Sequence, residues 1–350
     1  MTTVRATSSR LTSFVVASRY LPVYIAIVLL LVVAAIWAPN SVSSVSLRAI
    51  APYGALLGIT ALGQMLVIMT GGIDLSTPGT VTLAAAITVG VGAQSDDRIA
   101  LAILTALGAG ALIGLLNGIL IGGLKLNALI VTLAVGQVVI GVVNRFGRTF
   151  PVQSSAPSGW SNWISTRILG VSPVFWLGAL LTVALVLGFR YTALGRRFQV
   201  VGANPMASHV VGIRVNLNQI LVYVVAAVLY ALAGVALAGL LPVPGVAPHN
   251  QYLLGPIAAV VIGGASLTGG LASAFSTFAA ALFLTALNQM LLTLGLPTAL
   301  QFVVFGLVII GGMLVSGDRI IKVVERVLRE RRSTRRPNDK TKHRSIDEPG

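Results

Sequence analysis

Long apolar runs, separated by short polar or basic gaps, make up most of this chain. A transmembrane helix needs about 20 mostly apolar residues to cross a hydrocarbon core of about 30 Å. Ten runs approach that length, at 21–38, 50–69, 77–93, 99–122, 126–143, 171–189, 219–241, 253–266, 270–294 and 297–316. The runs 77–93 and 253–266 are short and contain Gly and Pro, which is typical of broken or re-entrant helices. The pattern predicts an all-α, polytopic membrane protein with about ten transmembrane helices, within a range of eight to ten.

Composition agrees with a membrane environment. The 350 residues are 56% hydrophobic and 9% charged, whereas a soluble domain has about 25% charged residues. The formal net charge is +15, but 11 of the 24 Lys and Arg follow Gly317, and most others lie in gaps between apolar runs. This distribution is not the clustered basic patch of a nucleic-acid-binding protein. We therefore expect contact with membrane lipids and none with nucleic acid.

The basic residues also predict an orientation, because cytoplasmic loops of membrane proteins carry an excess of Lys and Arg. If ten spans are drawn with the N-terminus in the cytoplasm, 19 of the 24 Lys and Arg are cytoplasmic. We interpret the run 21–38 as a first span and not as a cleaved signal sequence. The sequence thus predicts a multi-pass protein of a cell membrane with both termini in the cytoplasm.

Four segments follow from this topology. Residues 1–20 form a cytoplasmic segment, and residues 21–316 form the membrane domain, which includes a basic cytoplasmic loop at 190–218. Residues 317–332 have apolar positions at helical spacing with basic residues between them. That pattern predicts either a helix on the membrane surface or a plain continuation of the last span. Residues 333–350 are polar and basic, and we expect them to be disordered.

Two internal patterns bear on helix packing. The run 127–141 resembles 297–311, and the two runs have opposite directions in the predicted topology, as an inverted repeat requires. A second pattern is a glycine at every fourth position, at Gly110, Gly114, Gly118 and Gly122. These glycines draw a smooth ridge along one helix, and we expect the backbone of another helix to approach it closely.

Few residues of the chain are suited to chemistry. Only three acidic residues precede Asp318, namely Asp74, Asp96 and Asp97, so no series of buried carboxylates is available to move protons or sodium ions. The sequence has no G-x-x-x-x-G-K-[ST] loop for nucleotide phosphates, no Cys, and no set of His ligands at metal spacing. We therefore expect no catalytic residue, no metal and no cofactor. Energy for active transport would come from a separate ATPase.

Asp74 lies in the segment 71–76 (GGIDLS), directly before the helix predicted from Thr77. Its carboxylate is suited to the free N–H groups at that helix N-terminus, and contact with a substrate is the alternative. Six amides within the spans also have two interpretations, since they either bond to neighbouring helices or line a substrate pathway. They are Gln64, Asn117, Gln137, Asn288, Gln289 and Gln301. Together with Asp74 they are the candidates for the pathway of a neutral, hydroxyl-rich solute.

Three segments resemble one family: 63–76 (GQMLVIMTGGIDLS), 193–213 (ALGRRFQVVGANPMASHVVGI) and 263–267 (GGASL). In this order they are similar to permease subunits of bacterial ABC importers for monosaccharides, of the ribose and xylose type, in the branched-chain amino acid/sugar permease superfamily. The resemblance covers about residues 45–316. It implies a translocation pathway for a sugar across a bacterial inner membrane.

The resemblance also implies partners: a second permease copy in a homodimer, a cytoplasmic ABC ATPase subunit, and a periplasmic or lipid-anchored solute-binding protein. The loop 190–218 would then be the segment that docks into the ATPase. Its matching positions are Gly195, Arg196, Arg197, Gly202, Asn204, Ala207, Gly212 and Ile213. Met206 departs from the family, which usually has an acidic residue there, and Pro78 replaces a small or branched residue.

Two alternatives stay open at this point. Related importers carry a nucleoside or a branched-chain amino acid on the same fold. An ATP-independent facilitator or a membrane scaffold would also have about ten spans and few buried charges. Uptake into liposomes without an ATPase separates a facilitator from an importer subunit.

Overall fold

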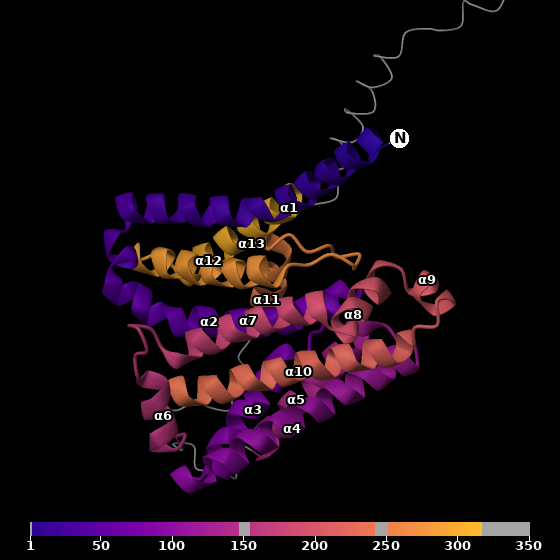
Figure 1. Ribbon diagram of the computed structural model, residues 1–350. Coiled ribbons are helices and arrows are strands. Elements are labelled where there is room, and N and C mark those ends of the chain that lie inside the picture. Colours follow the sequence, from indigo (N-terminus) through magenta and orange to yellow (C-terminus); the bar gives the residue numbers. More distant parts are fainter. Residues whose placement is uncertain (1, 147–154, 242–250, 317–350) are drawn as a thin grey trace, which may run out of the picture.

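The computed structural model describes residues 2–146, 155–241 and 251–316, and this part of the chain is helical apart from its connections (Figure 1). Its longer helices are α1 (Thr2–Trp37), α2 (Ser44–Met69), α3 (Thr77–Gly92), α4 (Ile99–Gly118), α5 (Ala128–Phe146), α6 (Ser158–Ser165), α7 (Pro173–Tyr191), α8 (Ala193–Ala203), α10 (Val215–Leu240), α11 (Gln251–Ile262), α12 (Ala274–Thr293) and α13 (Thr298–Ser316). Its shorter ones are η1 (Pro39–Val42), η2 (Asp96–Arg98), η3 (Ile119–Gly123) and α9 (Pro205–Val210). The segment 317–332, for which a surface helix or a continuation of the last span was predicted, lies outside the described residues. The segment 333–350, for which disorder was predicted, lies outside them too.

The predicted apolar runs correspond to helices. The first of them, α1, begins at Thr2 and not near residue 21, and the bounds of the others differ from the predicted runs by a few residues. In the described part of the chain, seven helices are long and apolar enough to cross a membrane, and three further apolar helices are shorter. The prediction of an all-α polytopic membrane protein is confirmed. The two short runs do form short helices, since α3 has 16 residues and α11 has 12, and their re-entrant or broken character stays a prediction. Ten spans and the inverted repeat stay predictions.

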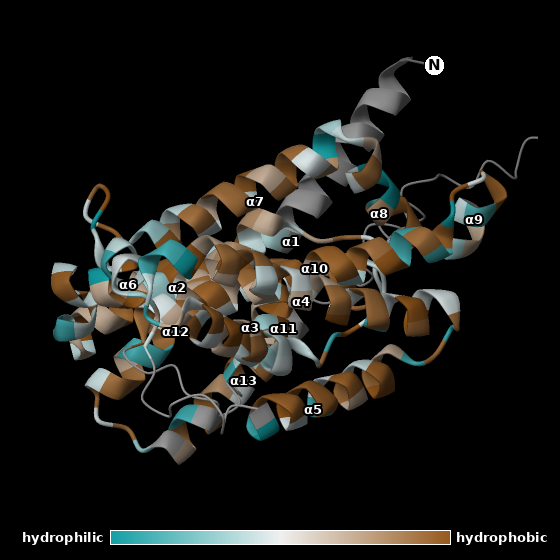
Figure 2. Ribbon diagram, turned by 90° about the horizontal axis from the view of Figure 1, so that it is seen from below, coloured by the Kyte–Doolittle hydropathy of each residue, from teal (hydrophilic) through white to brown (hydrophobic). Residues whose placement is uncertain are grey.

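The core of the protein is built around α2. This helix packs against α10, α12, α11 and α7, and 89% of its apolar window is buried, compared with 11% for α1. The outer helices instead consist largely of hydrophobic residues, as Figure 2 shows for α5. Large apolar side chains of the outer helices, among them Leu29, Leu104 and Leu180, are exposed. In a bilayer such side chains face lipid, so both the core and the lipid-facing surface of the protein are apolar.

The predicted glycine ridge packs against α10. A Cβ atom at Gly114 would overlap the carbonyl oxygen of Tyr223, and one at Gly118 would lie 2.8 Å from the Cα of Ile220. Gly110 and Gly122 approach the same helix. The prediction that these glycines serve packing is therefore confirmed, and the close approach brings the side chains of α10 next to those of α3 and α4.

The bundle has two ends, each marked by short helices. α8 and α9 lie at one end, near the start of α1, and α6 lies at the opposite end (Figure 1). We call them the α8 end and the α6 end. Arg190, Arg196 and Arg214 lie on or beside α8 and α9. At the α6 end, Trp160 Nε1 donates a hydrogen bond to the Val235 carbonyl at 3.1 Å, which holds α6 against α10.

Candidate functional site

Side-chain caps fix the starts of the two short helices at the α8 end. α8 follows Thr192, whose Oγ1 accepts a hydrogen bond from the Gly195 N–H at 3.0 Å. α9 follows Asn204, whose Oδ1 accepts one from the Ala207 N–H at 2.9 Å. Caps of this kind satisfy N–H groups that a helix start leaves free. Asn204 and Ala207 therefore determine the shape of this segment.

Gly195 and Gly202 lie where α8 meets the ends of two other helices. A Cβ atom at Gly195 would overlap the Gly188 carbonyl in α7, and one at Gly202 would overlap the carbonyl oxygen of Met69, the last residue of α2. Both obstacles are backbone atoms, which cannot swing aside as a side chain end does. Only glycine permits such an approach.

The turn 263–273, between α11 and α12, reaches the same place. The Gly270 N–H donates a hydrogen bond to the Met69 carbonyl oxygen at 2.8 Å. Gly270 has a φ of +85°, which favours glycine, and a Cβ there would lie 2.9 Å from the Cα of Ala203. α2, α8 and the 263–273 turn thus meet around Met69. They contain the three segments that carried the family resemblance, which are far apart in the sequence.

The outward side of α9 is exposed and apolar. Met206 is 77% exposed and Val210 is 81% exposed. Arg197, Ile213 and Arg214 line a neighbouring groove of about 400 Å³. Apolar side chains next to arginines on a surface are typical of protein-binding sites.

The end of α9 depends on Gly212. This residue has a φ of +81°, and the Ile213 N–H that follows it donates to the Ser208 carbonyl oxygen at 3.0 Å. A glycine in the left-handed conformation is a common way to end a helix. Gly212 and Ile213 therefore set the direction in which the chain leaves α9 for α10. Arg196 donates to the Arg190 carbonyl oxygen at 3.1 Å and is otherwise exposed.

Asp74 lies in a second candidate region, a polar cluster inside the bundle. The carboxylate Oδ1 accepts hydrogen bonds from the Ser76 N–H at 2.8 Å and from the Ser76 hydroxyl at 2.6 Å. It thus binds the N–H directly before the first helical residue of α3. The carboxylate therefore closes the turn that leads into α3, whose N-cap residue Ser76 makes no side-chain cap, and capping of the helix by Asp74 stays a prediction.

The cluster joins four helices to the segment 70–76. With its amide oriented to satisfy both groups, Gln64 of α2 pairs with the backbone N–H and carbonyl of Asp74, each at 3.1 Å. Asn117 Nδ2 of α4 donates to the Ser76 hydroxyl at 3.0 Å, and Thr132 Oγ1 of α5 accepts from the Leu75 N–H at 2.9 Å. Gln64 precedes the end of α2 by five residues, so Asp74 lies about 8 Å inside that end. The segment therefore runs back into the bundle before α3 begins.

Three buried polar atoms of this region have no hydrogen-bond partner among the described residues. They are Asp74 Oδ2, Asn117 Oδ1 and the hydroxyl of Tyr223 on α10. Seven residues further along α10, the Tyr230 hydroxyl lies 3.0 Å from the Gln64 amide. These two tyrosines and Thr132 were not among the site residues predicted from the sequence. A spacing of seven residues places both tyrosines on one face of a helix. This spacing is the feature of the sequence from which they could have been predicted to lie together.

The other amide candidates do not join the cluster. Gln137 is exposed on α5, and Asn288 and Gln289 are half-buried on α12. Gln301 is buried, and its Nε2 donates to the Leu296 carbonyl oxygen at 2.8 Å, which closes the turn before α13. The structure therefore brings together Gln64, Asp74 and Asn117 and leaves the remaining four apart from them.

Comparison with known proteins gives the class to which this architecture belongs. Residues 46–313 match the family described as branched-chain amino acid transport system / permease component. The chain belongs to this family. It is a permease component of an ABC transporter, a multi-pass membrane subunit that is not itself an enzyme.

Two permeases from other bacterial importers are similar to this chain over most of its length. The ribose import permease protein RbsC of Escherichia coli (strain K12) is 31% identical over 299 residues, which cover 84% of this chain and 92% of that protein. The autoinducer 2 import system permease protein LsrC of Yersinia pseudotuberculosis serotype O:1b (strain IP 31758) is 31% identical over 289 residues, covering 80% and 79% respectively. No solved structure matches the chain significantly.

Proposed function

We propose that this chain forms the translocation pathway for a monosaccharide in an ABC importer of a bacterial inner membrane. The observation that carries the proposal is the junction at Met69, where α2, α8 and the 263–273 turn meet. A docking helix that is packed against the central helix can pass on a displacement to the whole bundle. The choice of a sugar is supported by the similarity to the ribose import permease protein RbsC.

The α8 end then faces the cytoplasm and docks the ATPase. Exposed Val210 and Met206 supply apolar contact area, and Arg196 and Arg197 add charge. ATP binding closes the ATPase pair and displaces α8 and α9. Because Gly202 packs against the last carbonyl of α2, α2 moves with α8. Both chain termini lie on this cytoplasmic side, and the solute-binding protein docks at the α6 end.

The solute is a neutral molecule with several hydroxyl groups. Among the described residues, Asp74 is the one buried acidic residue, and it is bonded to Ser76. A zwitterionic amino acid would require buried counter-charges of both signs. A nucleoside is the second candidate, because it too is neutral and hydroxylated.

A second copy of the chain packs against the open side of α5. This side of the helix exposes Gln137 between Leu133, Ala134 and Val138. An amide in the middle of an apolar helix face is unfavourable in lipid and favourable at a protein contact or a wet pathway. We therefore propose a homodimer with the solute pathway between its two copies, and Gln137 as the amide nearest to it.

The test is reconstitution of the full chain in liposomes, with and without a sugar-importer ATPase and binding protein from the same genome. Radiolabelled ribose should accumulate against its gradient only when all three proteins and ATP are present. Equilibration of ribose by the chain alone would identify a facilitator. Accumulation driven by a proton or sodium gradient without ATP would refute the proposal.

A further inference from the structure

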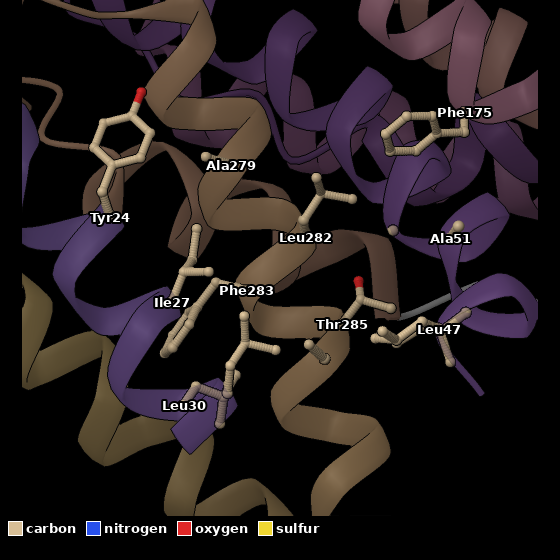
Figure 3. Close-up of a pocket in the computed structure, with 14 residues that line it drawn as sticks. Tyr24, Ile27, Leu30, Leu47, Ala51, Phe175, Ala279, Leu282, Phe283 and Thr285 are labelled. Carbon is tan, nitrogen blue, oxygen red and sulfur yellow. The ribbon is translucent and has the colours of Figure 1, made fainter. Parts of the chain in front are cut away.

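A groove separates α1 from the rest of the bundle. α1 rests on α12 near the α8 end, where the Tyr24 hydroxyl lies 3.4 Å from the Ser276 hydroxyl, and η1 connects it to α2 at the α6 end. Between these two attachments lies a cavity of about 330 Å³ (Figure 3). α2 lines it with Leu47, Ala51 and Gly54, and Phe283 lines it from α12.

The groove offers no free polar group to a ligand. Thr285 lines it, but its hydroxyl donates to the Ala281 carbonyl oxygen of its own helix at 2.9 Å. The Tyr24 hydroxyl is oriented away from the centre of the groove, beside Ser276 (Figure 3). Cavities with such a lining do not hold ordered water. The ligand that fits here is a hydrocarbon.

The groove is reached from the bilayer. Leu31 of α1 and Leu47 of α2 line it and are each 40% exposed. α1 is the least buried of the long apolar helices, so lipid surrounds it. An empty groove would lose dispersion contacts along its four lining helices, α1, α2, α7 and α12. The hydrocarbon that surrounds the protein in a bilayer is a lipid acyl chain.

One end of the groove has a cation. Arg48 follows Leu47 near the start of α2, is exposed, and forms no hydrogen bond or ion pair with the described part of the chain. Its Nε lies 3.9 Å from the position that a Cβ would take at Gly170. Trp176 follows the groove residue Phe175 at the start of α7, and its side chain is 39% exposed. Trp and Arg at a helix end are typical of the depth of lipid headgroups.

We propose that this groove binds one acyl chain of a phospholipid whose phosphate contacts Arg48. An arginine guanidinium is well suited to a phosphate, which it binds through charge-assisted hydrogen bonds. The segment 333–350 of the chain itself does not suit the site, because it is polar and carries the same charge as Arg48. The proposal concerns a face of the protein away from the α8 end and does not depend on the transported solute.

Native mass spectrometry of the full chain in detergent tests the proposal. Phosphatidylglycerol and diacylglycerol with the same acyl chains are titrated separately. We expect one tightly bound phosphatidylglycerol and roughly tenfold weaker binding of diacylglycerol, since the latter lacks the phosphate. Arg48→Gln should remove this difference. Ala51→Phe should fill the groove and reduce binding of both lipids at least tenfold.

Gly108→Phe is the matched control, because Gly108 is exposed on α4 with nothing within 4 Å of a Cβ. It should bind both lipids as the unmodified chain does. Ala279→Phe fills the groove from α12 and replaces Ala51→Phe if that variant is not monodisperse. Unchanged binding in a folded groove variant would overturn the site, and equal binding of the two lipids by the unmodified chain would overturn the role of Arg48. Loss of a dimer without loss of lipid in the groove variant would identify a second copy as the occupant and also overturn the proposal.

Discussion

The Met69 carbonyl oxygen accepts a hydrogen bond from the Gly270 N–H at 2.8 Å, and the Cα of Gly202 packs against that same oxygen. The last carbonyl groups of a helix have no partner within the helix. Here the 263–273 turn supplies a hydrogen bond to one of these carbonyl groups, that of Met69, and α8 packs over the same group. This contact connects the proposed docking helix to the most buried helix of the bundle.

Gly202→Leu should uncouple the permease from its ATPase. The new side chain would overlap the Met69 carbonyl and push α8 away from α2. We expect sugar-stimulated ATPase activity to fall at least tenfold in the reconstituted complex, with normal membrane insertion. Gly108→Leu, which meets open space, should keep the activity. Full stimulation in Gly202→Leu would show that α8 does not act through this contact.

Val210→Asp should weaken binding of the ATPase without destabilising the permease. Val210 is 81% exposed, so its replacement should change the free energy of unfolding by less than about 0.5 kcal/mol. A charge in the centre of an apolar contact is unfavourable, and we expect at least a tenfold loss in co-purification. Leu169→Asp is the control, because Leu169 is 85% exposed beside α6 at the other end. If the control alone loses the ATPase, the proposed orientation is reversed.

Asp74→Ala should destabilise the protein, whereas Asp74→Asn should not. Alanine leaves the buried Ser76 N–H and hydroxyl without their acceptor, at a cost of about 1–3 kcal/mol. Asparagine keeps an oxygen at the position of Oδ1 and removes a buried charge that has no cationic partner among the described residues. Unfolding in SDS titrations measures the difference. A loss in Asp74→Asn as large as that in Asp74→Ala would mean that the charge itself is required.

Tyr230→Phe and Tyr223→Phe should have different effects. The Tyr230 hydroxyl is bonded to Gln64, and its removal should cost about 0.5–1.5 kcal/mol. The Tyr223 hydroxyl has no partner among the described residues, so its removal should be neutral or stabilising. The two variants are compared by their thermal midpoints in detergent. A larger loss for Tyr223→Phe would reveal a partner for that hydroxyl that the described residues do not supply.

The sequence by itself determined the class of fold and most helix bounds. A bilayer requires long apolar helices, so the runs 171–189 and 270–294 could be found by hydropathy alone as α7 and α12. The short runs were also identified correctly, because Gly and Pro interrupt them. The glycine spacing on α4 predicted a packed ridge, since a period near that of the helix places all four residues on one face.

Only the tertiary structure decided what these helices contact. The sequence did not show that residue 69 meets residues 202 and 270, because contacts between distant segments depend on how whole helices pack. Nor did it separate Asn117, which bonds to Ser76, from Gln137, which is exposed. An amide in an apolar run has the same local pattern in either case, and hydropathy reports burial in lipid or protein without distinguishing them. The neighbours of each side chain are set by helix rotation and close packing, which the periodicity of an almost uniformly apolar helix leaves undetermined.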